Sequence, residues 1–205
     1  MNYYERKIFP KMLEKVMSQE NYAKERAATL KHSNGRVLEI GFGTGLNLPH
    51  YPSHIKKIEA LDINPGMNET AYQRMNASGI EVKHHCLSTE KLPFKDNKFD
   101  TVVSTWTLCS ITDLHSALIE VNRILKPGGQ LLFLEHGLAD TKSIRGIQHT
   151  YTPIKKIIAC GCRINIPIDE IISQAGFKIN HLERFILDNT SAITGSMYRG
   201  VAMSL

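Results

Sequence analysis

The chain has 205 residues, a length that fits one domain with a sizeable core. Hydrophobic residues make up 42% and charged residues 22%, as in an ordinary soluble globular protein. The net charge is +5, but no dense Lys/Arg run or RNA-binding aromatic motif accompanies it, so we expect no nucleic-acid partner.

The N-terminal segment is expected to be helical over residues 3–31, because its apolar side chains recur at helical spacing. Pro10 marks either a break or a helix start within it. We expect residues 1–34 to form a helical cap on one domain that spans residues 1–205. Tyr3 and Tyr4 either close over a ligand or serve packing.

A glycine turn follows the first predicted strand. The apolar residues Val37, Leu38 and Ile40 suit a buried strand, and the next five residues, 41–45, carry glycine at alternate positions. Glycine lets the chain turn sharply and lets its backbone lie against a ligand. A second strand, Ile58–Leu61, ends at Asp62, where a carboxylate is placed to hydrogen-bond the two hydroxyls of a ribose. The sequence therefore predicts a site for a nucleoside-containing cofactor.

The order of the remaining elements predicts an α/β fold. Helices are expected after Leu46, from Asn64-Pro65 to Gly79, after the N-cap Asp113, and after Pro167. Strands are expected at residues 80–82, 98–105, 130–134, 177–185 and 198–203, with the turn 126–129 ending the helix before residue 130. This alternation favours a Rossmann-like doubly wound sheet, mostly parallel, with helices on both faces and a C-terminal antiparallel strand.

Residues 138–163 break the alternation and are expected to be a long loop. The segment 138–165 is therefore a predicted lid or acceptor segment. Its basic residues form either a solvated face or an attraction for an acidic acceptor or lipid headgroup.

The cysteines give no sign of a disulfide framework or a metal centre. Cys86, Cys109, Cys160 and Cys162 include one C-x-C pair and no zinc spacing, so we expect free thiols and no metal. Residues 1–10 lack an apolar signal core, and no run of about 20 apolar residues occurs. A cytoplasmic protein without a transmembrane segment is expected.

Two positions, Leu46 and Glu39, discriminate between cofactors. Leu46 occupies the place where a dinucleotide fingerprint should have its third glycine. Glu39 would repel a pyrophosphate but would suit an ammonium or sulfonium group. S-adenosylmethionine (SAM) carries both of these groups, and its ribose still needs Asp62.

The motifs resemble those of class I SAM-dependent methyltransferases of the type 11 group. The resemblance rests on the segments 37–45, 61–63, 92–94, 99–103 and 120–129, in the family's order. A narrower likeness, to small alkyl-thiol methyltransferases, rests on residues 106–111, 134–136 and 161–162. Related proteins of that broad group methylate quinone precursors or phosphatidylethanolamine.

The resemblance implies a set of site residues. The methionine part of SAM would be held by Glu39, Gly41, Gly43 and Gly45, with Asn47, Thr105 and Leu108 beside it. The ribose and adenine would be held by Asp62, Ile63, Met67, Ser88, Thr89 and Glu90. The family often has Asp at the position of Ser88, and Glu90 is the substitute. The acceptor would meet Trp106, Cys109, His136 and Tyr151.

His136 is the candidate catalytic base or acceptor-positioning group, because histidine ionises near neutral pH. A structural histidine behind the pocket is the alternative. The expected activity is methyl transfer from SAM to a small or lipid-like acceptor, with S-adenosylhomocysteine as product. An alkyl thiol is favoured slightly over a quinone precursor or phosphatidylethanolamine. The alternatives of another class are a non-catalytic SAM-binding protein and an NAD(P)-binding oxidoreductase.

Overall fold

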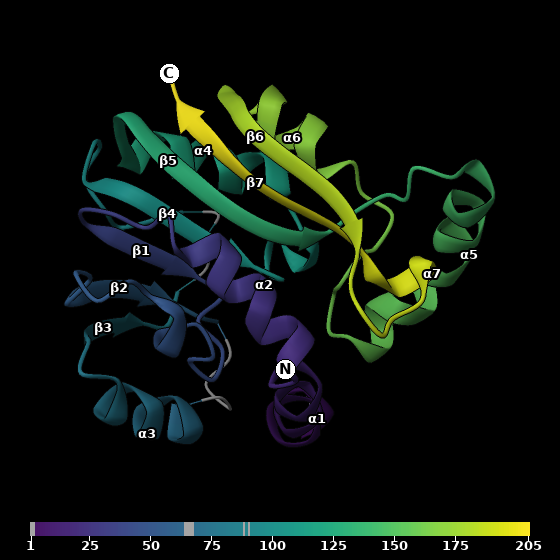
Figure 1. Cartoon of the computed structure of the whole chain (residues 1–205), viewed down its shortest axis with the longest axis horizontal. Helices are drawn as coiled ribbons and strands as arrows, with labels where there is room; N and C mark the ends of the chain where they lie inside the picture. Colours follow the sequence, from purple (N-terminus) through teal and green to yellow (C-terminus); the bar gives the residue numbers. More distant parts are fainter. Residues whose placement is uncertain (1–2, 64–67, 88, 90) are drawn as a thin grey trace.

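One seven-stranded sheet organises the protein, in the order β3-β2-β1-β4-β5-β7-β6 (Figure 1). The computed structural model describes residues 3–63, 68–87, 89 and 91–205. The strands are β1 (Val37–Ile40), β2 (Lys57–Leu61), β3 (Glu81–His85), β4 (Phe99–Thr105), β5 (Leu125–His136), β6 (Phe177–Ile186) and β7 (Ser196–Ser204). β1 to β5 pair in parallel, and β7 is antiparallel to both β5 and β6. The predicted Rossmann-like sheet with an antiparallel C-terminal strand is confirmed.

Helices cover both faces of this sheet. They are η1 (a π-helix, Tyr4–Ile8), α1 (Phe9–Met17), α2 (Glu20–Leu30), η2 (3-10, Leu48–His50), α3 (Asn68–Ser78), η4 (3-10, Leu108–Ser110), α4 (Leu114–Ile124), α5 (Lys142–Ile158), α6 (Ile168–Gln174) and α7 (Ala192–Gly195). Figure 1 shows α2 in front of the sheet and α4 and α6 behind it.

The alternation of side chains along the central strand explains the two layers. In β1, Val37 packs in one cluster with Leu30 of α2, whereas Leu38 packs in another cluster with Leu118 of α4. All four of these side chains are fully buried. A central parallel strand is buried on both faces, which is why every residue of β1 except Glu39 is apolar.

The predicted helix boundaries are partly confirmed. Asp113 caps α4, where its carboxylate accepts a hydrogen bond from the Ser116 backbone N–H at 3.1 Å. Pro10 lies in the first turn of α1, directly after the π-helix η1, so a helix starts there as one of the two predicted alternatives. Residues 3–31 are largely helical, as predicted, in the three segments η1, α1 and α2. A further break, which was not predicted, lies at Ser18 and the extended Gln19 before α2 begins. The helix start predicted at Asn64-Pro65 lies outside the described residues.

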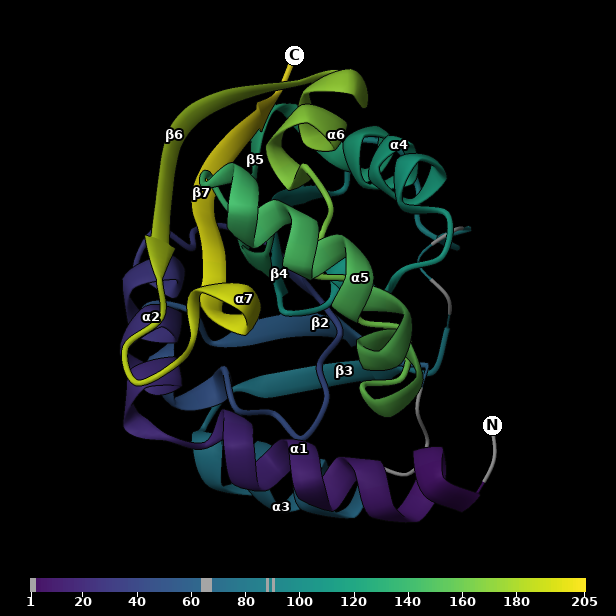
Figure 2. The same cartoon turned by 90° about the vertical axis from the view of Figure 1, so that its right-hand side faces the viewer.

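Two later predictions are also corrected. Residues 142–158 form the 17-residue helix α5 rather than a loop, and it accommodates Pro153 in its interior. β5 begins at Leu125 rather than at residue 130, because Leu125 pairs with Phe99 before the register shifts. The carboxyl end of β5 leads toward α5, which Figure 2 shows in front of the sheet.

Candidate functional site

A cavity of about 760 Å³ lies at the carboxyl ends of the parallel strands. Its wall takes residues from α1, α2, the glycine turn, the ends of β2, β4 and β5, and α5. Ligand sites in doubly wound sheets lie at this edge. Of the predicted site residues, the wall includes Glu39, Gly41, Gly43, Asn47, Asp62, Ile63, Thr89, Thr105, Trp106, His136 and Tyr151.

Glu39 brings a buried carboxylate to the floor of this cavity. Its side chain is fully enclosed by protein and accepts hydrogen bonds from Tyr51 Oη at 2.7 Å and Asn47 Nδ2 at 3.0 Å. Asn47 Nδ2 also lies 3.0 Å from Thr105 Oγ1, which ties the glycine turn to β4. Burial raises the pKa of Glu39 to about 7, although both hydrogen bonds and the charge of Arg26 lower it. A cationic group of a ligand placed beside Glu39 would therefore stabilise its ionised form further.

The glycine turn and Asp62 are held in one arrangement. The backbone N–H groups of Gly41 and Phe42 both donate to the Leu61 carbonyl, and Gly43 N–H donates to Asp62 Oδ2 at 2.7 Å. Gly41 has φ +75°, and a Cβ there would come within 1.8 Å of Thr107 Oγ1. Only glycine fits this position, so the turn brings its backbone to the cavity wall.

Arg26 of α2 is a buried cation on the same wall, and sequence reasoning missed it. Its Nη1 donates to the Met17 carbonyl at 2.7 Å, and its guanidinium carbon lies 4.8 Å from the Trp106 ring centre. Burial lowers the pKa of Arg26 to about 10, so it keeps its charge at neutral pH. Trp106 has φ +51°, and its buried Nε1 has no hydrogen-bond partner among the described residues.

Glu135 organises the loop that follows β4. Its Oε1 accepts hydrogen bonds from Ser104 Oγ at 2.8 Å and from the Thr107 and Leu108 N–H groups at 3.0 Å. Its Oε2 accepts from the Cys109 N–H at 3.3 Å. This carboxylate is fully buried, and burial raises its pKa. Glu135 thus fixes the start of η4, and with it the position of Cys109.

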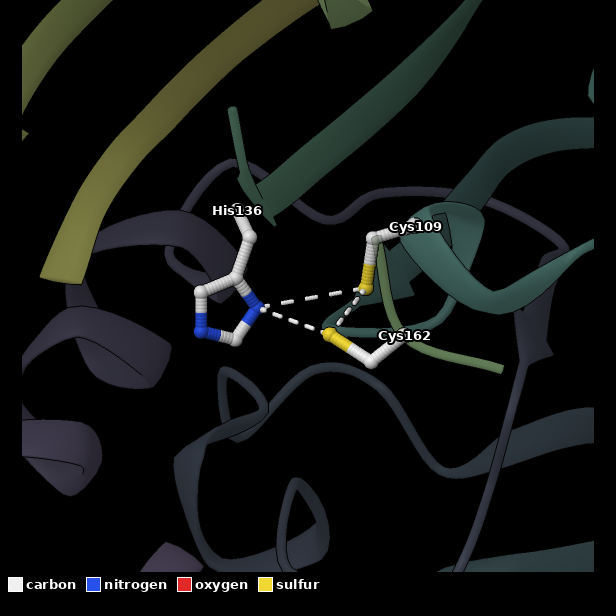
Figure 3. A group of neighbouring side chains, drawn as sticks. All are labelled: Cys109, His136 and Cys162. Atoms are coloured by element: carbon white, nitrogen blue, oxygen red, sulfur yellow. Dashed lines mark hydrogen bonds between the residues drawn. The ribbon is translucent and has the colours of Figure 1, made fainter. Parts of the chain in front are cut away.

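Cys109, His136 and Cys162 come together beside the cavity (Figure 3). The two sulfur atoms are 3.5 Å apart, and His136 Nδ1 lies 3.9 Å from Cys109 Sγ and 3.7 Å from Cys162 Sγ. The hydrogen bond to Cys162, together with burial, raises the pKa of Cys109 well above its usual range. The hydrogen bond from Cys109, aided by His136, lowers the pKa of Cys162. The pair therefore favours one thiolate, on Cys162.

Other predicted residues lie away from the cavity wall. Leu108 is fully buried in the core behind it, and Cys109 is buried beside His136. Gly45 packs near Leu48 and the Phe42 ring. Met67, Ser88 and Glu90 lie outside the described residues.

Local sequence signals were weak for the site residues that sequence reasoning missed. Tyr51 and Arg26 reach the site from segments without a motif. Cys162 was visible as part of the C-x-C pair, but only the fold brings it to Cys109 and His136. Within the part of the chain that the structure describes, no helix combines the length and apolar character needed to cross a bilayer.

Comparisons with known proteins agree with this geometry. Residues 38–133 match the sequence model of a family described as "Methyltransferase domain". The chain is similar to "Methyltransferase OMS1, mitochondrial" of Saccharomyces cerevisiae, with 28% identity over 83% of this chain and 40% of that protein. It is also similar to the phosphatidylethanolamine N-methyltransferase of Cereibacter sphaeroides, with 30% identity over 63% of this chain and 64% of that protein. The chain thus spans less than two thirds of the length of these relatives.

A solved structure shares the whole fold. It is described as a SAM-dependent methyltransferase, possible histamine N-methyltransferase, from Thermotoga maritima, with a TM-score of 0.71 and 23% identity over 98% of each chain.

Proposed function

Because the chain carries a class I SAM-dependent methyltransferase domain, we propose that it transfers a methyl group from SAM to a small or lipophilic acceptor. The observation that carries the proposal is the buried Glu39 carboxylate on the cavity floor, with its pKa raised to about 7. A ligand ammonium beside it would favour the ionised form. SAM supplies such an ammonium on its methionine part.

The other contacts follow from the cavity wall. Asp62, whose carboxylate accepts a hydrogen bond from the Gly43 N–H, would accept hydrogen bonds from the ribose hydroxyls, and Ile63 would pack against the adenine. Thr89 also lines the cavity and is a further candidate for the adenine side, whereas Met67, Ser88 and Glu90 are proposed from the resemblance alone. The pyrophosphate of NAD(P) fits poorly, because the Glu39 carboxylate would repel it.

The proposed chemistry asks little of the enzyme beyond positioning. When bound, SAM supplies an activated methyl group with a good leaving group. The protein aligns the acceptor with that methyl and, where the acceptor is protonated, removes one proton. His136, at the end of β5 on the cavity wall, is the proposed base or positioning group, and Trp106 and Tyr151 would line the acceptor side.

The N-terminal helices and α5 are proposed to close this cavity. Glu14 of α1 accepts hydrogen bonds from Thr44 Oγ1 of the glycine turn and from Arg74 Nη2 of α3, each at 2.5 Å. These contacts tie the cap, residues 1–34, to the cofactor loop. Segment 138–165 would act as the acceptor lid, since Tyr151 and Ile158 of α5 line the cavity.

The acceptor we favour is an alkyl thiol, with a quinone precursor or phosphatidylethanolamine as the second choice. Apolar side chains of α1 and α5, including Met12, Val16 and Ile158, line the cavity and remain partly exposed. They suit an acceptor with an alkyl portion. The similarity to a phosphatidylethanolamine N-methyltransferase favours the lipid alternative.

The test is product formation from methyl-labelled SAM. The purified chain would be offered an alkyl thiol, a quinone precursor, phosphatidylethanolamine vesicles or no acceptor. Label in the thiol above the no-acceptor control supports the favoured acceptor, and label in another compound replaces it. SAM binding by calorimetry without label in any arm would favour a non-catalytic SAM-binding protein. Absence of SAM binding would overturn the proposal.

A further inference from the structure

Three side chains that commonly bind metals, two thiols and one imidazole, meet beside the cavity from three separate parts of the chain. Cys109 comes from η4, His136 from the end of β5, and Cys162 from the segment after α5. Figure 3 shows the His136 ring with Nδ1 turned toward both sulfur atoms. Methyl transfer from SAM needs no enzyme thiol, so the proposed reaction leaves both cysteines without a role.

The three distances match the edges of a metal tetrahedron. Zn–S bonds of about 2.3 Å and Zn–N bonds of about 2.0–2.1 Å place tetrahedral S···S pairs about 3.8 Å apart and S···N pairs about 3.5 Å apart. The observed separations are 3.5 Å for S···S, and 3.7 and 3.9 Å for S···N. One ion can therefore reach all three atoms with small side-chain adjustments.

The backbone around the cluster holds the ligands in place. Glu135 accepts a hydrogen bond from the Cys109 N–H, and the Cys109 carbonyl accepts one from the Arg163 N–H at 3.0 Å. Arg163 Nη2 also donates to the Ile111 carbonyl at 2.5 Å. Gly161 has φ +101°, and a Cβ there would come within 3.1 Å of the Ser110 carbonyl oxygen. These contacts tie the segment that carries Cys162 to the loop that carries Cys109, as partners of metal ligands commonly do.

We infer that Cys109, His136 and Cys162 bind one zinc ion, whose fourth coordination position faces the cavity. Within the cluster, Cys109 is buried and does not line the cavity, whereas His136 and Cys162 are on the cavity wall. Three protein ligands with one open position are the arrangement of a catalytic zinc site, and two thiolates with one imidazole form a known ligand set for it. Thiolate ligands also favour zinc over magnesium or calcium.

The open position would take the sulfur of a thiol acceptor, a step that rests on the proposed function. The thiol binds as its thiolate and releases its proton to solvent, since metal coordination deprotonates a thiol. The thiolate sulfur then forms a bond to the methyl carbon of SAM while the sulfonium C–S bond breaks. The products are a methyl thioether and S-adenosylhomocysteine. In this arrangement His136 is a ligand rather than the base.

The experiment measures zinc affinity in the full chain, without methyl transfer. Reduced, metal-free protein competes with a chromophoric chelator for Zn(II). We expect one zinc per chain, and a loss of affinity of at least about a hundredfold in Cys109→Ser, Cys162→Ser and His136→Gln, more than outer-shell changes cause. Cys86→Ser, at an exposed cysteine outside the cluster, is the matched control and should keep wild-type affinity. Circular dichroism and SAM affinity verify that each variant folds.

A second readout uses Co(II) in place of zinc. A sulfur-to-cobalt charge-transfer band that both cysteine variants reduce, and that an added alkyl thiol shifts, would support the site and its open position. The inference is overturned when the folded variants bind zinc like the wild type, or when the reduced wild type binds none. It is also overturned when zinc binding depends on Cys86. Zinc binding without methylation of any acceptor would support the metal site and reject only the acceptor proposal.

Discussion

The ionisation of Glu39 should make SAM binding depend on pH in a predictable direction. The carboxylate has a pKa of about 7 because burial favours its neutral form, and the proposed ammonium contact requires its charged form. Acidification should therefore weaken SAM binding by protonating Glu39 before the ligand arrives. Replacing the residue, as in Glu39→Gln, should weaken binding at pH 7.0 and remove most of the pH dependence.

The size of the effect follows from that pKa. With a pKa of about 7, roughly half of the Glu39 side chains are ionised at pH 7.0 and about 3% at pH 5.5. If only the ionised form binds well, the apparent Kd of SAM rises about sixteenfold between these two values. The comparison stops at pH 7.0 because an α-amino group, such as that of SAM, begins to lose its proton above it.

Calorimetric titration with SAM at pH 5.5 and 7.0 measures this change. Glu39→Gln is the necessary control, because it removes the ionisable group and keeps the rest of the cavity wall. The variant should lose the part of the pH dependence that Glu39 causes. Equal affinities of the wild type at both pH values would refute the assignment of Glu39 to the ammonium.

The other predictions concern stability and the cofactor loop. The folded pKa of Glu39 is raised from its ordinary 4.5 to about 7, so its contribution to folding stability is largest below pH 4.5 and is lost as pH rises through 7. At pH 8 and without ligand, Glu39→Gln should therefore have a free energy of unfolding up to about 3 kcal/mol higher than the wild type, which thermal unfolding measures. Asp62→Ala should weaken SAM binding at least about tenfold, since a charge-assisted hydrogen bond contributes about 1.5–3 kcal/mol; unchanged affinity in calorimetry would reject the ribose contact. Gly41→Ala should lower unfolding stability by about 2 kcal/mol or more, because its Cβ would meet Thr107 Oγ1 at 1.8 Å. Gly79→Ala, at a similar φ of +69° but in open space, is its control, and equal losses in urea unfolding would contradict the steric argument.

The sheet could be predicted because its strands carry local signals. β1 is mostly apolar and β4 combines apolar with small polar residues, as suits buried strands, and Asp113 is a strong N-cap directly before an amphipathic stripe. Such signals depend on a few neighbouring residues, so they remain readable without the tertiary structure. The cofactor edge could be predicted for the same reason, since the carboxyl ends of parallel strands meet at one side of the sheet.

The helix α5 could not be predicted from local signals, because they point to a loop. Gly146 and Pro153 both disfavour a helix interior, yet the helix passes through them. Tertiary contacts offset this cost: Gln148 is fully buried and donates from Nε2 to the carbonyls of Gly137 and Ile193, while its Oε1 accepts from the Ala139 N–H at 2.8 Å. One buried amide thus fixes the helix against the segments before and after it.

The cluster of Cys109, His136 and Cys162 shows the limit of reading ligand sets from spacing. Cys109 and Cys162 are separated by 53 positions, so no short motif connects them. Glu135 connects two members of the cluster, because it accepts a hydrogen bond from the Cys109 N–H and directly precedes His136 in the chain. A buried carboxylate is costly unless it is hydrogen-bonded, and the four bonds that Glu135 accepts meet that requirement. Glu135 therefore positions the Cys109 thiol by holding the loop that carries it, and the His136 imidazole as its neighbour in the chain. We expect Glu135→Gln to loosen both Cys109 and His136 and so to weaken zinc binding at the proposed site.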